Sequence, residues 1–296
     1  MHRPVARRKL GVFGVDRRIN SPKFPTYPYT AVGQLLVRDN DNRYECSGAL
    51  IAPDKVLTAA HCLYNRRAQT FYTVVGFSAG RYRSNTTGEV RDPFGMQTWA
   101  HIDIVDGYVN SKFEDPNPMD LAVVSLQEPV GYAAGWMGLF KPCQPTFQQS
   151  YTAFTAGYPV DKPQGHGVTT NCTTTQIDCN AGYQYHSCDA VEGQSGSAMW
   201  MLQMDPVTQL YLPYVRAVHN VEWRAADGIT VIANSAVAIT PSHYQLLANW
   251  TSDSSGAKAL PPAGARNIQT SYIFGEPYRG WGLGREKLRD LVVAGF

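Results

Sequence analysis

Long hydrophobic runs, a strong charge of either sign and paired-cysteine metal motifs are all missing from this chain of 296 residues. No apolar run approaches the roughly 18–20 residues that a membrane-spanning helix needs, so we expect no membrane partner. The net charge is only +2, which gives no reason to expect nucleic acid as a partner. The cysteines show no Cys-Xaa-Xaa-Cys spacing, which argues against zinc, and we expect neither a metal nor a cofactor.

Long amphipathic helical patterns are also scarce, whereas glycine, proline, tyrosine and valine are plentiful. This composition is typical of an all-β protein built from short strands and turns. With 44% apolar residues the chain has enough material for a sizeable core, in one large or two small domains.

An even number of cysteines, six, fits three disulfides formed in an oxidising compartment. Asn85, Asn171 and Asn249 each begin an Asn-Xaa-Thr sequon, which together with paired cysteines favours a secreted glycoprotein. Residues 1–9 are basic and no apolar segment follows them, so we expect the signal peptide to be absent from this chain.

The stretch from Glu192 to Ser197 has the composition of a serine nucleophile and its oxyanion hole. A serine hydroxyl needs a base to remove its proton and backbone N–H donors to hold the oxyanion that forms. Small residues around Ser195 allow a substrate carbonyl to approach those N–H groups closely. Because Gly-Xaa-Ser-Gly also occurs by chance in loops, the stretch indicates a nucleophile only if a base and an acid lie upstream.

A base and an acid do lie upstream. Residues 46–62 contain two apolar runs around a Pro-Asp turn, which predicts a β-hairpin with His61 at the end of its second run. Further along, Asp120 opens the apolar segment 121–126, where a charge is costly unless it is paired. The N–H of an imidazole is a natural partner for this carboxylate.

Three signatures, Thr58–Cys62, Asp120–Ala122 and Gly193–Gly196, together resemble those of the chymotrypsin-like serine peptidases, in that family's order of His, Asp and Ser. Two further stretches, Gly11–Arg18 and Tyr27–Gly33, resemble the mature start of the bacterial glutamyl endopeptidase branch.

Other details point to the same branch. Ser197 stands where most trypsin relatives carry glycine, as in glutamyl endopeptidases. Cys188–Ala190 and Val237–Pro241 are more similar to secreted animal peptidases related to that branch. The resemblance covers roughly residues 11–250 and leaves 251–296 outside it.

The resemblance implies an all-β, chymotrypsin-like fold of two antiparallel β-barrels with a C-terminal helix and an extension. We place the peptidase domain at 11–250, with barrels at about 28–130 and 146–240. Thr240 is a plausible N-terminal cap for the helix. Residues 251–296 form an extension that either packs back onto the barrels or engages a partner.

The same resemblance implies the catalytic roles. Ser195 would be the nucleophile, His61 the general base, and Asp120 the residue that orients the imidazole. The N–H groups of Gly193 and Ser195 would form the oxyanion hole. The alternative readings are a turn serine, a structural histidine and a buried capping aspartate.

The expected activity is that of a secreted, monomeric serine endopeptidase acting on peptide or protein substrates through an acyl-enzyme. One alternative from another class is a catalytically silent relative that serves as a binding protein. A second is an esterase that uses the same machinery.

In this family a disulfide anchors the histidine, which implies a Cys46–Cys62 pair across the predicted hairpin. The other four cysteines allow three pairings, of which we prefer Cys172–Cys188 with Cys143–Cys179.

The signals for specificity conflict. His219 lies in a stretch resembling the strand that carries the glutamate-reading histidine of glutamyl endopeptidases, but a threonine that assists those enzymes falls at Ala190. Asp189 stands where trypsin places its carboxylate for basic side chains, and it could instead bond backbone groups beside Cys188. We place an acidic P1 residue ahead of a basic one, and ahead of a small or apolar one or no strong preference. His219 could also be an ordinary core histidine.

Residues 1–10 are expected to be a propeptide remnant or a tag, and Arg7–Lys9 fits either a zymogen processing site or a solvated basic tail. In trypsin relatives an acidic residue before the serine pairs with the new N-terminal amine. Gln194 carries no charge, so that ion pair cannot form, and we expect any activation step not to run through residue 194.

Overall fold

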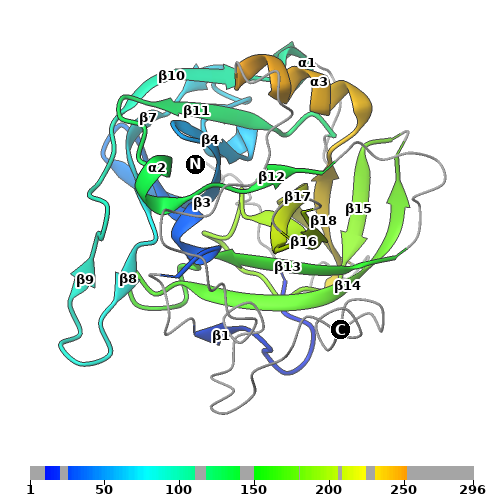
Figure 1. Ribbon diagram of the computed structural model, residues 1–296. Helices are drawn as coiled ribbons and strands as arrows, with labels where there is room; N and C mark the ends of the chain where they lie inside the picture. Colours follow the sequence, from blue (N-terminus) through cyan, green and yellow to red (C-terminus); the bar gives the residue numbers. More distant parts are fainter. Residues whose placement is uncertain are drawn as a thin grey trace, which may run out of the picture.

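Short apolar strands separated by turns build most of the structure, which is a computed structural model. It describes residues 11–20, 26–110, 118–140, 150–179, 181–205, 209–224 and 231–251. The strands gather into two large sheets that pack side by side (Figure 1). The predicted all-β class with a helix at the end of the peptidase region is therefore confirmed.

The first large sheet has six strands in the order β10-β11-β4-β3-β2-β7. In chain order these strands are β2 (Val32–Asp39), β3 (Asn42–Ala52), β4 (Lys55–Thr58), β7 (Thr73–Ala79), β10 (Trp99–Ile104) and β11 (Ala122–Leu126). A bridge between Phe77 and Gln97 joins β7 to the segment that leads into β10, so the two ends of the sheet curl toward each other.

The second large sheet closes on itself, because β15 pairs with both β18 and β14. Its strands are β13 (Thr152–Gly157), β14 (Val168–Asp178), β15 (Tyr183–His186), β16 (Ala198–Met204), β17 (Tyr211–Arg224) and β18 (Val231–Ala238). Two short strands join it from outside this run: β1 (Ile19–Asn20) pairs with β14, and β12 (Gly138–Leu139) pairs with β17. The N-terminal segment is thus tied to the second barrel rather than the first.

Two small hairpins lie outside the barrels. One pairs β5 (Tyr64–Asn65) with β6 (Thr70–Phe71), and the other pairs β8 (Tyr82–Arg83) with β9 (Val90–Arg91). The β8–β9 hairpin extends away from both barrels (Figure 1), and Asn85 is exposed in its turn.

Helices are few and short: η1 (Tyr29–Ala31), η2 (Ala60–Cys62), α1 (Asp106–Asn110), α2 (Gly131–Ala134) and α3 (Pro241–Trp250). The predicted cap of α3 is present, since Thr240 Oγ1 accepts a hydrogen bond of 3.2 Å from the backbone N–H of His243. Leu247, on the inner face of this helix, is fully buried in the apolar core. Among the described residues no helix combines the length and apolar character needed to cross a membrane.

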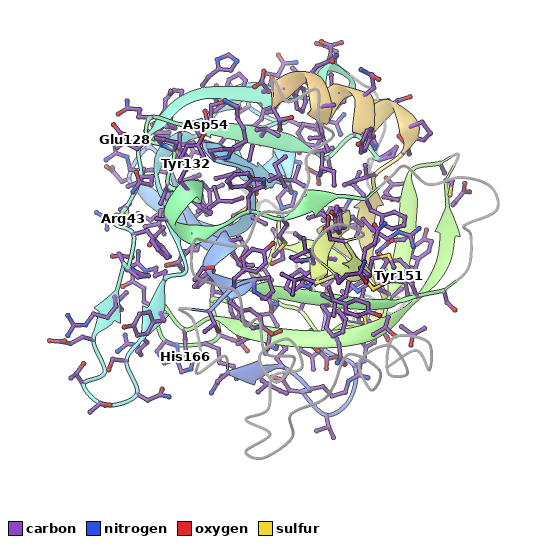
Figure 2. All side chains as sticks on the ribbon, in the orientation of Figure 1. Arg43, Asp54, Glu128, Tyr132, Tyr151 and His166 are labelled. Atoms are coloured by element: carbon purple, nitrogen blue, oxygen red, sulfur yellow. A yellow bond between two sulfur atoms is a disulfide. The ribbon has the colours of Figure 1, made fainter. Side chains whose placement is uncertain are left out.

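A large apolar cluster contains residues of both barrels. It includes Leu35 and Phe77 from the first sheet and Trp200 and Val218 from the second, all fully buried. At the edge of the second barrel, the Arg216 guanidinium stacks 4.3 Å from the ring centre of Tyr151, which Figure 2 labels. This shared core gives groups on the two barrels a rigid common base.

Candidate active site

His61 and Asp120 are brought together by strand pairing. His61 lies in η2, directly after β4, and Asp120 lies just before β11. Because β4 and β11 run antiparallel with Thr58 opposite Ala122, the end of one strand meets the start of the other.

Asp120 holds His61 at two points. Its Oδ1 accepts a hydrogen bond of 2.8 Å from the backbone N–H of His61, and its Oδ2 lies 2.8 Å from His61 Nδ1. The carboxylate is fully buried, whereas 16% of the His61 side chain is exposed. A carboxylate can only accept, so Nδ1 carries the proton and Nε2 keeps a lone pair that can take a proton from another group.

Ser195 belongs to the loop between β15 and β16, and this loop rests on the first barrel. The carbonyl oxygen of Ser195 accepts a hydrogen bond of 2.8 Å from the N–H of Ser47 on β3. Cys62 Sγ, one residue beyond His61, lies 3.7 Å from the same carbonyl oxygen. Ser195 is therefore placed beside the histidine turn, although it comes from the other barrel.

Glycine is required at position 196 because the loop packs so closely on the first barrel. Gly196 has φ +83°, and a Cβ there would lie 2.2 Å from Thr58 Oγ1 and 2.3 Å from the carbonyl oxygen of Ser47. Within the described residues no hydrogen bond joins Ser195 Oγ to His61. Catalytic hydrogen bonds in substrate-free enzymes are often long and shorten when substrate binds.

Two backbone N–H groups of the loop point away from the hydrogen bonds that the preceding carbonyls accept. The carbonyl of Glu192 accepts from Val160 N–H at 2.8 Å, and the carbonyl of Gln194 accepts from Ser197 N–H at 3.0 Å. In a trans peptide the next N–H points opposite to the carbonyl, so the N–H groups of Gly193 and Ser195 point away from these partners. In the part of the chain that the structure describes, neither N–H donates a hydrogen bond, which leaves both free to hold an oxyanion.

Asp189 does not have the placement expected of a residue that reads a basic substrate side chain. It is fully buried, its Oδ1 accepts from Phe13 N–H at 2.8 Å, and its Oδ2 accepts from the N–H and Nε of Arg17 at 2.9 and 3.1 Å. Both carboxylate oxygens thus hold the N-terminal segment. Ala190 is buried against the same segment, with its N–H 3.2 Å from the carbonyl oxygen of Gly11.

The backbone of His219 bonds to the loop that carries Ser195. Its carbonyl accepts from Gly196 N–H at 3.0 Å, and its N–H donates to the carbonyl of Ser197 at 2.9 Å. The imidazole is fully buried, and neither ring nitrogen has a hydrogen-bond partner among the described residues. Burial lowers the pKa of His219 to about 3, so the ring is neutral at pH 7.

A second imidazole, which the sequence analysis did not single out, packs against the first. The His186 ring lies 4.4 Å from that of His219, centre to centre, in an edge-to-face arrangement. Burial, together with the neighbouring His219, holds the pKa of His186 well below its ordinary value. His186 lies on β15 and His219 lies on β17, and β18 stands between these two strands in the sheet. A contact of this kind depends on strand order, so no pattern in the sequence indicated it.

Two disulfides flank the site. Cys46–Cys62 ties β3 to the turn that carries His61, and Cys172–Cys188 ties β14 to the segment just before Asp189. Cys179 is also disulfide-bonded, and its expected partner Cys143 lies outside the described residues. Among the described residues, two groups of cysteine and histidine lie close enough to share a metal ion, and each contains one of these disulfides, so their sulfur atoms are not available as thiolate ligands.

Sequence reasoning also missed Ser47 and Arg18. Ser47 Oγ donates a 2.8 Å hydrogen bond to the carbonyl of Gly193, and Arg18 Nη1 donates to Gln194 Oε1 at 3.2 Å. Residue 194 is therefore in contact with the N-terminal segment after all, although through a neutral side chain. Neither role has a local sequence signal, since both contacts span well over a hundred residues.

Comparison with known proteins finds peptidases among the similar sequences. A sequence model described as Trypsin matches residues 23–211. The glutamyl endopeptidase of Bacillus licheniformis is 27% identical over 240 residues, which cover 81% of this chain and 68% of that protein. Serine protease 23 of Homo sapiens is 24% identical over 262 residues, covering 83% of this chain and 65% of that protein.

Another relative, described as an extracellular metalloprotease of Bacillus subtilis, is 26% identical over 195 residues, covering 64% of this chain and 57% of that protein. The chain thus spans between about half and two thirds of the lengths of these relatives.

Solved structures match the fold. A Glu endopeptidase in complex with MPD superimposes with a TM-score of 0.65 at 23% identity, covering 82% of this chain and all of that one. The protease Anisep from Arthrobacter nicotinovorans gives a TM-score of 0.58 at 14% identity, covering 79% of this chain and 98% of that one. With the chymotrypsin-like fold shown by these structures and a family model covering more than half of its length, the chain belongs to the trypsin family of serine peptidases.

Proposed function

We propose that this chain is an endopeptidase in which Ser195 is the nucleophile, His61 the general base and Asp120 the orienting carboxylate. The observation that carries the proposal is the double hydrogen bond from His61 to Asp120, beside a serine whose loop presents two free N–H groups. The first holds an imidazole ready to accept a proton, and the second offers a place for the negative charge that results.

The reaction proceeds in two halves. Ser195 Oγ forms a bond to the scissile carbonyl carbon while His61 Nε2 takes the Oγ proton, and the carbonyl electrons move onto the oxygen. The N–H groups of Gly193 and Ser195 hold this oxyanion, and loss of one such donor costs about 2.7–4 kcal/mol of transition-state stabilisation. The imidazolium then gives its proton to the amide nitrogen as the C–N bond breaks, and water repeats the sequence to release the acid.

Active-site labelling tests this proposal. A fluorophosphonate probe should label the secreted form of the wild type on Ser195, and N-terminal sequencing of the same sample reports its mature start. Ser195→Ala should abolish labelling, whereas Ser125→Ala, which removes a buried hydroxyl on β11, should not. A folded wild type that is not labelled would overturn the proposal and favour a binding protein with a silent site.

We further propose that the substrate pocket prefers an acidic P1 residue, read by His219. Both oxygens of Asp189 are bonded to the N-terminal segment, so this carboxylate is not free to attract a basic side chain. A neutral imidazole carries one N–H, and the ring nitrogens of His219, whose backbone bonds to Gly196 and Ser197, have no hydrogen-bond partner among the described residues. A substrate carboxylate would supply the partner that this ring lacks.

Cleavage of a peptide library tests the preference. Products ending in Glu or Asp should dominate over those ending in Ala, Lys or Arg. Equal cleavage after Glu and Ala would contradict the acidic preference while leaving the endopeptidase proposal intact.

Secretion as a glycoprotein is proposed from the exposed sequons. A glycosylation acceptor must be exposed, and so are the side chains of Asn85, Asn171 and Asn249. Each barrel also contains a disulfide, as is typical of secreted proteins. Protein expressed through a secretory pathway should gain mobility on treatment with a peptide N-glycosidase, and no change would contradict glycosylation. The segment 7–9, which fits either a processing site or a basic tail, lies outside the described residues.

A further inference from the structure

Arg18 is a buried guanidinium in the N-terminal segment whose partners converge on the nucleophile loop. Only 1% of its side chain is exposed. It donates to Asp16 at 2.8–2.9 Å, to both oxygens of Asp161 at 2.6 and 3.0 Å, and to Gln194 Oε1 at 3.2 Å. Burial by itself would lower the pKa of this arginine, but the hydrogen bonds with the two carboxylates outweigh it and raise the pKa above its ordinary value. The group is therefore permanently charged, and its charge is balanced by Asp16 and Asp161.

One arm of this cluster supports the N–H of Ser195. Gln194 is fully buried, and its Oε1 accepts from Val191 N–H at 3.1 Å as well as from Arg18. The backbone N–H of Gln194 donates to the carbonyl of Val191 at 3.0 Å, which closes the turn from both sides. The orientation of the peptide between residues 194 and 195, and with it the Ser195 N–H, depends on where Gln194 is held.

The other arm supports the N–H of Gly193. Asp161 follows Val160, whose N–H donates to the carbonyl of Glu192 at 2.8 Å. That hydrogen bond sets the orientation of the peptide between Glu192 and Gly193, and so turns the Gly193 N–H outward. By binding both Asp161 and Gln194, Arg18 connects the supports of the two oxyanion donors.

We propose that Arg18 is a positioning residue that holds the oxyanion hole in its open arrangement through Gln194 and Asp161. In trypsin relatives a free N-terminal amine pairs with the acidic residue before the serine. Here the internal side chain of Arg18 and the neutral side chain of Gln194 make the corresponding contact. The consequence is that the site is organised whenever residues 16–18 are docked, whatever the position of the chain's first residue. This inference rests on the proposed endopeptidase function.

The experiment compares kcat and KM of Arg18→Met with those of wild type, after fluorophosphonate labelling has shown that wild type is active. Loss of one oxyanion donor costs about 10²–10³ in kcat, so loss of its support should lower kcat by about 10–100-fold, with KM changed by less than about threefold. Arg81→Met is the matched control, since Arg81 is also buried beside a carboxylate, Asp92, but lies outside this cluster. It should leave kcat within about twofold of wild type.

A second pair of variants separates a positioning role of Arg18 from a general effect on stability. Gln194→Glu places a carboxylate against the guanidinium, so it should be tolerated within about threefold in kcat when Arg18 is present. In the Arg18→Met background the same change leaves a buried carboxylate without its cation and should cost at least a further tenfold. Equal effects of Gln194→Glu in both backgrounds, or an Arg18→Met enzyme with wild-type kcat, would overturn the proposal.

Should Arg18→Met fail to fold by near-ultraviolet circular dichroism, Arg18→Lys and Asp161→Asn replace it. The lysine keeps the charge but cannot bridge three partners, so kcat should fall for both variants, and wild-type kcat in both would overturn the proposal. A wild type that the fluorophosphonate does not label is a failure of the proposed function, not of this inference.

Discussion

Ser47 Oγ donates a 2.8 Å hydrogen bond to the carbonyl oxygen of Gly193, and thereby joins β3 of the first barrel to the nucleophile loop of the second. The same hydroxyl accepts from Tyr158 N–H at 2.9 Å, and the backbone N–H of Ser47 donates to the carbonyl of Ser195. One buried residue thus holds the carbonyls of both residues whose N–H groups face outward.

Replacing Ser47 by alanine should lower both the stability of the fold and kcat. The change removes the donor to Gly193 and leaves its buried carbonyl with one partner fewer, a loss of about 1–3 kcal/mol. We expect kcat to fall about tenfold while KM stays within about twofold, measured on a peptide ester or amide substrate. Ser125→Ala, a change of the same chemistry away from the loop, is the control, and an equal loss in both variants would contradict the role of Ser47.

Asp120→Asn should lower kcat by about 10⁴-fold at pH 7, as it does in a serine peptidase triad, with little change in KM. The amide can donate to His61 Nδ1, which would favour the tautomer that has its proton on Nε2 and cannot accept one from Ser195. Asp54→Asn is the control, because Asp54 pairs with Lys55 at the far end of β4 and lies at the edge of the first barrel (Figure 2). A loss below about tenfold for Asp120→Asn would argue against His61 as the base.

His219→Leu should reduce discrimination between glutamate and alanine at P1. The leucine fills the buried site but offers no N–H, so the ratio of kcat/KM for Glu over Ala substrates should fall by about 10–100-fold, in the range expected for loss of a charge-assisted hydrogen bond. His243→Gln is the matched control, since it removes a buried histidine from α3 while glutamine at this position can still complete the helix cap. An unchanged ratio in His219→Leu would leave His219 as a core histidine.

Acid should destabilise the fold because of the two buried imidazoles. In the unfolded chain each takes up a proton near pH 6.5, whereas in the folded chain the pKa of His219 is lowered to about 3. Between these values the unfolded state binds more protons, so the free energy of unfolding should fall as the pH falls from 6.5 toward 3, by at most about 1.4 kcal/mol per pH unit for one histidine. Above the unfolded pKa of about 6.5 this contribution is constant.

Denaturant titrations between pH 7.5 and 4 measure this slope. His219→Phe should flatten it, and His101→Phe, at an exposed site on β10, should not. A slope that is the same in wild type and His219→Phe would contradict the buried neutral state of His219.

The two described disulfides offer a matched comparison, because both join cysteines 16 positions apart. The chain-entropy model then predicts about 3 kcal/mol of stabilisation for each. Paired Cys→Ala variants should lose comparable free energies of unfolding in denaturant titrations. The Cys46–Cys62 variant should lose more kcat, since Cys62 adjoins His61, and the reverse order would contradict the proposed anchoring of that turn.

The parts of the site that the sequence predicted are those with a strong local signal. The apolar runs before His61 and after Asp120 indicated strands, and those strands became β4 and β11, which pair side by side. Thr240 was predicted to cap a helix from its residue type and the following Pro241, and it does. In each case the backbone responds to neighbours within a few residues, which a single sequence displays.

The parts that could not be predicted depend on which distant groups share one buried volume. Asp189 was weighed as a reader of basic substrates, but its carboxylate holds the segment from Phe13 to Arg17. His186 packs on His219 from another strand of the closed barrel, and the residues around His186 in the sequence did not indicate that contact. Such pairings are set by strand order and loop packing.

The order of His61, Asp120 and Ser195, with the strand and turn patterns around them, carried the resemblance that predicted the family, which the family model confirms. The catalytic roles of these residues stay a prediction. Only the tertiary structure showed that Ser47 and Arg18 bond to the loop that carries Ser195, and that Gln194 is buried within it. The physical reason is that a charge such as Arg18 can be buried only where several partners converge on it, and convergence is a property of the folded chain.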